Sequence, residues 1–133
     1  MIPRVLAGVA AGLILAAATQ AGGAATPATK SDQRLQKLLA GRVAGAPKTC
    51  IRPDFSARPE IFEGAGIIYR DGRTTYLATM ADGCPALRES RTIITRTQAG
   101  SICRNDPVRI VEPTGADFGF CTFSGFTPYT KSR

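Results

Sequence analysis

Four cysteines and the absence of histidine are the features of this chain that bear most directly on chemistry. Histidine is the commonest general base and metal ligand, so its absence argues against most hydrolytic and metal-dependent sites. Cys50, Cys84, Cys103 and Cys121 are too far apart to form the close pairs that are typical of zinc sites. We therefore expect no cofactor and no metal site, and we expect the cysteines to form two structural disulfides.

The four cysteines allow three pairings, and the expected order of strands favours a nested one. Sequential pairing would join Cys103 to Cys121, and in an extended hairpin these two residues would lie about 20 Å apart, too far for a disulfide. Nested pairing, Cys50–Cys121 with Cys84–Cys103, ties the first strand to the last and suits a sheet that curls on itself. Sequential pairing stays open, and the crossed pairing is ranked last.

No side chain has the sequence context of an activated nucleophile. The chain lacks a G-x-S-x-G elbow and an S-x-x-K motif, and its cysteines have no histidine partner. Two carboxylates can catalyse hydrolysis without histidine, but Asp71 and Asp106 have contexts typical of turns, and Glu60 and Glu63 fit solvated side chains. These observations favour a non-catalytic binding or accessory module. An enzyme that acts on an envelope substrate through carboxylates or arginines is the alternative.

The basic residues are the main indication of a binding function. The chain has 17 Lys and Arg against 10 Asp and Glu, a net charge of +7. We expect Arg88, Arg91 and Arg96 to bind an anionic envelope component, because Arg88 and Arg91 would share a face of a helical turn over Pro85–Ser90. A guanidinium donates two hydrogen bonds to one phosphate. The alternatives are a solvated basic surface and a partner that is another envelope protein.

Aromatic residues are concentrated near the carboxyl end, which holds four of the six phenylalanines. In a strand, Phe118 and Phe120 would share one face, while Cys121 and Phe123 would share the other. We expect both faces to be buried, with the amino-terminal helix covering one of them. The alternative is an exposed apolar patch.

The amino terminus has the pattern of a secretory signal. Arg4 precedes the uncharged apolar run Val5–Ala18, which is followed by small residues. This run is shorter than the roughly 20 residues that a spanning helix needs, so we expect cleavage and no stable membrane span afterwards. The expected organisation is a signal peptide at 1–21, a linker at 22–31 and one disulfide-stabilised domain at 32–133, located in the periplasm or secreted.

Short β-prone runs dominate the expected domain. One helix is expected over about Asp32–Arg42, and Asp71-Gly72 between two such runs predicts a hairpin. The predicted fold is mainly β, a small curled antiparallel sheet or partly open barrel of about six short strands with one N-terminal helix and two disulfides. A two-layer α+β fold is the alternative. The expected strands are at Cys50-Ile51, Gly66–Tyr69, Thr74–Thr79, Thr92–Thr97, Val108–Val111 and Gly119–Phe123.

Several short motifs between Leu38 and Tyr129 resemble those of a family of small secreted four-cysteine bacterial proteins of unknown function. The resemblance implies a secreted domain with four cysteines. It implies no activity, and it assigns no functional residue. The matching segments are Leu39–Gly45, Cys50-Ile51, the Tyr69–Tyr76 hairpin, Cys84–Arg88, Ile102-Cys103 with Asp106, Gly119–Cys121 and Pro128-Tyr129.

Overall fold

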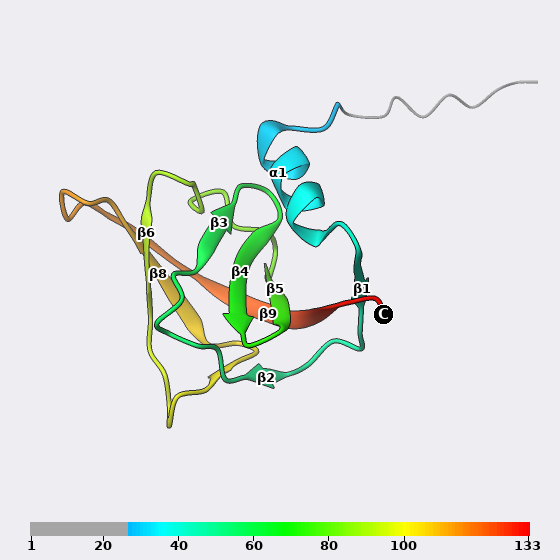
Figure 1. The fold of residues 1–133 in the computed structure, drawn as a ribbon. Helices are drawn as coiled ribbons and strands as arrows, with labels where there is room; N and C mark the ends of the chain where they lie inside the picture. Colours follow the sequence, from blue (N-terminus) through cyan, green and yellow to red (C-terminus); the bar gives the residue numbers. More distant parts are fainter. Residues whose placement is uncertain (1–26) are drawn as a thin grey trace, which may run out of the picture.

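A computed structural model describes residues 27–133, which form one helix and nine strands (Figure 1). The expected signal peptide, residues 1–21, and residues 22–26 of the expected linker lie outside the described residues. The elements are α1 Lys30–Leu39, β1 Arg42–Ala44, β2 Cys50–Ile51, β3 Glu60–Phe62, β4 Gly66–Asp71, β5 Thr74–Met80, β6 Thr92–Thr95, β7 Ile102–Cys103, β8 Pro107–Val111 and β9 Asp117–Lys131.

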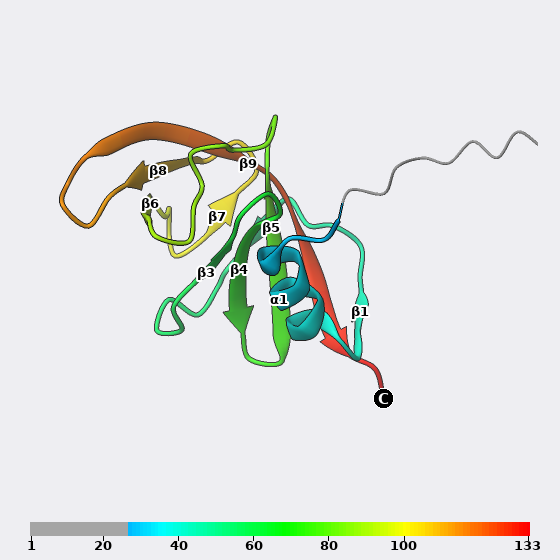
Figure 2. The ribbon, with the colours of Figure 1, turned by 90° about the horizontal axis from the view of Figure 1, so that it is seen from above.

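Seven of the strands form one curled antiparallel sheet. Its order is β3-β4-β5-β9-β8-β6, and β1 also pairs with β9. A second, two-stranded sheet joins β2 to β7. Strand β9 bends through the molecule: its first half pairs with β8, and its second half pairs with β5 and β1 (Figures 1 and 2). The predicted mainly β fold with one helix and two disulfides is confirmed.

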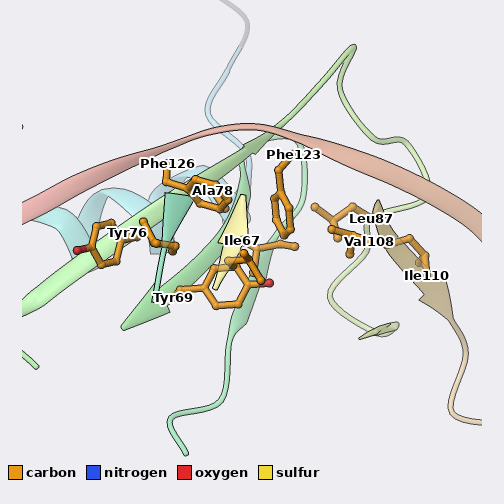
Figure 3. Packing of buried hydrophobic residues seen from close by; sticks show 11 residues of the cluster. Ile67, Tyr69, Tyr76, Ala78, Leu87, Val108, Ile110, Phe123 and Phe126 are labelled. Carbon is orange, nitrogen blue, oxygen red and sulfur yellow. The ribbon is translucent and has the colours of Figure 1, made fainter. Parts of the chain in front are cut away.

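The hydrophobic core lies on the inner side of the curl. Strand β4 contributes Ile67 and Tyr69, β8 contributes Val108 and Ile110, and β9 contributes aromatic rings (Figure 3). Alternate residues of a strand point to opposite faces, so Arg109, between Val108 and Ile110, points away from this core. The curl therefore gives the β6-β8-β9 part of the sheet a buried inner face and an outer face.

Helix α1 packs against β3, on the side of the β3-β4-β5 layer that is opposite to the core (Figure 2). Its Arg34 guanidinium lies 5.0 Å from the centre of the Phe62 ring, and Phe62 is buried. The helix begins earlier than predicted, because Thr29 caps it: the Thr29 hydroxyl accepts from the Asp32 N–H at 3.1 Å, and the Asp32 carboxylate accepts from the Thr29 N–H at 2.9 Å. It ends at Leu39, before Gly41, whose φ is +72°.

The β4–β5 hairpin is confirmed, but its turn is one residue later than the Asp71-Gly72 pattern indicates. Asp71 pairs with Thr74, so Gly72 and Arg73 form the two-residue loop. Gly72 has a φ of +56°, a conformation that glycine adopts without steric cost.

The predicted nested disulfide pairing is wrong. The bridges are Cys50–Cys103 and Cys84–Cys121, which is the crossed pairing that we expected least from the sequence. Cys50 in β2 lies directly opposite Cys103 in β7, with the two Cα atoms 4.0 Å apart. The prediction paired the first strand with the last and overlooked β7. Cys84 reaches Cys121 because the loop after β5 stays beside β9, where the Ala81 N–H donates to the Thr122 carbonyl at 2.8 Å.

Candidate functional site

The three arginines chosen from the sequence do not converge on one hollow. Residues 85–90 form no helical turn: Leu87 N–H donates to the Cys84 carbonyl and Arg91 N–H donates to the Arg88 carbonyl, which makes two consecutive tight turns. The predicted shared helical face is therefore wrong. Pro85 and the nearby Gly83 favour turns over a helix here.

Each of these arginines has different surroundings. Arg91 is half-buried; it donates to the Ala86 carbonyl at 2.7 Å and stacks 3.5 Å from the centre of the Phe118 ring. Arg88 is exposed and lies on a hollow that also has Glu63 and Asp82 on its walls. Only Arg96 lies on a hollow of the outer face of the sheet. Arg91 therefore packs against the Phe118 ring. Of the three arginines, only Arg96 lines a candidate binding surface on the outer face of the sheet.

This hollow lies on the outer face of β6, β8 and β9 and has a volume of about 410 Å³. Three of its side chains form a row across the sheet: Ile94 pairs with Arg109, and Arg109 pairs with Phe120. We call the surface around it the outer hollow, and its lining residues are Ile94, Arg96, Pro107, Arg109, Gly119 and Phe120.

The outer hollow has an exposed apolar part. The Phe120 residue is 70% exposed and Ile94 is 48% exposed, whereas Phe123 and Phe126 on the same strand β9 are completely buried. The prediction that both faces of this segment are buried, with the helix covering one of them, is wrong for the face of Phe118 and Phe120, because α1 packs at the other end of the sheet, against β3. The alternative of an exposed apolar patch is the one the structure shows.

Local backbone geometry holds Phe120 in this position. The β8–β9 register shifts between Arg109 and Val111, and Gly119 has a φ of +85°. Asp117 fixes the start of the strand, since its carboxylate accepts from the Gly119 N–H at 2.8 Å and from Arg109 Nε at 2.9 Å. The exposed rings of Phe118 and Phe120 therefore belong to an irregular segment of β9.

The two arginines of the outer hollow differ in their electrostatics. Arg109 forms an ion pair with Asp117, and the hydrogen bonds from Arg109 and from the Gly119 N–H lower the pKa of the Asp117 carboxyl. Arg96 belongs to none of the ion pairs found among residues 27–133. Arg96 therefore contributes the uncompensated positive charge of the outer hollow.

The outer hollow offers a surface for binding, but its lining contains no reactive group. Its lining contains no carboxylate and no thiol, and each of the four cysteines is in a disulfide. Within the described part of the chain, no three Asp, Glu or Cys side chains are grouped as metal ligands would be. The one strongly perturbed phenol, Tyr69, lies in the core, where burial raises its pKa, and Figure 3 shows it among apolar side chains.

Sequence reasoning missed Ile94, Arg109 and Phe120 as a group. One signal was present: the expected strand Thr92–Thr97 has two adjacent isoleucines, and adjacent residues of a strand point to opposite faces. The side chain of one of these two isoleucines must therefore point away from the core. The register that places Ile94 beside Arg109 and Phe120 could not be read from the sequence.

Comparisons with family models, with curated proteins and with solved structures give no match for this chain. Helix α1, the one helix among residues 27–133, is not long and apolar enough to cross a membrane.

Proposed function

We propose that this chain is a non-catalytic binding module of the cell envelope, periplasmic or secreted, that binds an extended segment of another envelope protein. The two disulfides support a location in an oxidising compartment. The apolar run near the amino terminus supports export. The partner segment adds to the sheet at β6 and places side chains in the outer hollow.

The observation that carries this proposal is the open edge of β6 beside the exposed Ile94 and Phe120. The sheet ends at β6, which pairs with β8 on one side, so the backbone groups of its other side are available to a further strand. Edge strands are commonly protected by an internal charge or proline. The sequence of β6, Thr-Ile-Ile-Thr, has neither. An added strand would gain main-chain hydrogen bonds from the edge and specificity from the hollow.

The lining of the outer hollow defines the side chains that the partner needs. Ile94 and Arg96 are two residues apart and both line the hollow, so they lie on one face of the chain. A neighbouring strand lies about 4.8 Å away, and its alternate residues point to the same face. An apolar side chain would therefore lie beside Ile94, and an acidic side chain two positions along would meet Arg96. The partner is an extended segment in which apolar and acidic residues alternate on one face.

A fluorophore-labelled synthetic peptide with the repeat Val-Thr-Asp-Thr is the probe for this proposal, because valine and aspartate two positions apart then alternate on one face of the strand. Fluorescence anisotropy measures its affinity, and backbone amide chemical shifts locate it. We expect the amides of β6 to shift most. Phe120→Ala should weaken binding by about tenfold or more, because burying a phenylalanine side chain contributes about 1.5–3 kcal/mol. Phe55→Ala is the matched control, since Phe55 is also an exposed phenylalanine, at 49% exposure, but lies in the loop before β3.

Three results would contradict the proposal. The first is no binding of the alternating peptide, and the second is equal weakening by Phe120→Ala and Phe55→Ala. The third is a dimer in light scattering that Ile94→Lys converts to a monomer, which would make a second copy of this chain the occupant of the β6 edge. A control peptide with lysine in place of aspartate should bind more weakly, because it would meet Arg96 with like charge.

A further inference from the structure

A second hollow collects positive charge. The elements around it, β1 and the end of β9, lie far from β6 (Figures 1 and 2). It has a volume of about 690 Å³ and lies where β1, the β4–β5 turn and the end of β9 meet. We call it the basic cleft, and its lining residues are Arg42, Gly72, Arg73, Thr130, Lys131, Ser132 and Arg133.

Hydrogen bonds between distant chain segments hold the walls of the basic cleft together. Arg42 in β1 pairs with Lys131 in β9, which places two basic residues on adjacent strands. The Arg42 guanidinium donates to the Arg73 carbonyl at 3.4 Å and so reaches the hairpin turn. The N–H of Ser132 donates to the Gly41 carbonyl at 3.1 Å. These contacts mean that the charges are brought together by the fold and not by adjacency in sequence.

The charges of the basic cleft are not compensated by neighbouring acidic side chains. Its lining has four cationic residues and no Asp or Glu. The ion pairs found among residues 27–133 are Arg34–Glu89, Arg70–Glu60 and Arg109–Asp117, and none involves a cleft residue. The nearest acidic residue in sequence, Asp71, precedes the turn and does not line the cleft. Like charges held in one hollow repel one another, so an anion bound there would be favoured.

We propose that the basic cleft binds a ligand carrying two or more phosphate groups. Guanidinium forks such as those of Arg42 and Arg73 match the planar, bidentate recognition of phosphate, and Lys131 adds a compact point charge. The hydroxyl of Thr130 adds a donor on the same wall. Several cations around one open hollow favour a multiply charged anion over a single carboxylate. This site is separate from the outer hollow and does not depend on the proposed binding of a protein segment.

Inorganic tripolyphosphate is the first probe, with affinity measured by isothermal titration calorimetry at low salt. Vesicles of phosphatidylcholine with and without cardiolipin, which carries two phosphates, are the second probe. The test variant is Arg42→Gln/Arg73→Gln/Lys131→Gln. Its matched control, Arg58→Gln/Arg88→Gln/Arg104→Gln, removes the same net charge from exposed positions outside the cleft.

We expect the test variant to bind tripolyphosphate at least tenfold more weakly and with a weaker dependence on salt concentration. The control variant should change the tripolyphosphate affinity by less than about threefold and keep the native salt dependence. The amides of the Gly72-Arg73 turn should shift on titration. Binding to tripolyphosphate alone identifies a free oligophosphate, and binding to cardiolipin vesicles alone identifies a lipid headgroup.

Equal weakening in both variants, or no binding of either probe to the native chain, would overturn the proposal. If the triple variant does not fold, Arg73→Gln alone replaces it, because Arg73 lies in an exposed turn and its side chain makes none of the hydrogen bonds found among the described residues. An Arg73→Gln protein that binds tripolyphosphate as tightly as the native chain does would then count against the cleft.

Discussion

Two phenylalanines of β9, three residues apart, should respond to the same substitution in opposite ways. Phe123 is completely buried and Phe120 is 70% exposed. Replacing each with alanine removes the same atoms from the same strand, so the comparison isolates burial. We predict that Phe123→Ala is strongly destabilising and that Phe120→Ala leaves the free energy of unfolding almost unchanged.

The expected magnitude follows from the neighbours of each ring. The centre of the Phe123 ring lies 5.1 Å from that of Phe126 and 6.2 Å from that of Tyr69, the latter edge to face (Figure 3). A buried phenylalanine replaced by alanine costs about 3–5 kcal/mol. Loss of two aromatic contacts places Phe123→Ala in the upper part of that range, about 4–5 kcal/mol. Exposed positions usually change stability by less than about 0.5 kcal/mol, which is the value expected for Phe120→Ala.

Urea unfolding followed by circular dichroism, with the disulfides intact, measures both variants. A loss of about 4 kcal/mol, with a slope of about 1–2 kcal/mol per molar, lowers the unfolding midpoint by about 2–4 M. A total stability of about 5–15 kcal/mol means that Phe123→Ala removes a large share of it. A cost above about 1.5 kcal/mol for Phe120→Ala would refute the reasoning. It would show that the Phe120 ring is packed and that the outer hollow does not present it.

Three other changes test the fold. Replacing both cysteines of the Cys84–Cys121 bridge with alanine should cost about 4 kcal/mol in urea unfolding, because the bridge spans 37 residues of sequence. Gly66→Ala should lower the thermal midpoint, at a cost of about 2 kcal/mol or more, because an added Cβ would lie 2.0 Å from a backbone oxygen at a φ of +144°. An NMR titration should give Asp117 a pKa below that of an ordinary aspartate, so its stabilising contribution is lost as the pH falls through this lowered pKa, and Arg109→Gln should raise that pKa.

The class of fold could be predicted because its signals are local. The runs on either side of Asp71-Gly72 are rich in β-prone residues and meet at a turn that requires positive φ, and the structure places the β4–β5 hairpin there. Strand β9 was predicted as five residues and extends over 15. Gly125 and Pro128 indicate interruption in the sequence, yet both lie inside β9, where pairing with β5 and β1 outweighs the local preference.

The candidate site could be predicted only in part. Arg96 was expected at a binding surface, and the structure places it beside an outer hollow, where its binding role stays a prediction. Its neighbours depend on a register shift between β8 and β9 that no short motif encodes. The predicted disulfide pairing was wrong for a related reason: the partner of β2 is β7, which is two residues long and therefore too short for any periodic signal.

The crossed bridges also determine what happens when the backbone is cut. Cys50–Cys103 and Cys84–Cys121 overlap in sequence, so every peptide bond from Cys50 to Cys121 lies within at least one closed loop. The Ala99-Gly100 turn, which is exposed, lies within both loops. A protease that cleaves there would leave two fragments still joined by two covalent links. Only cleavage combined with reduction would separate them, so a nicked chain would keep its strands together as long as its surroundings remain oxidising.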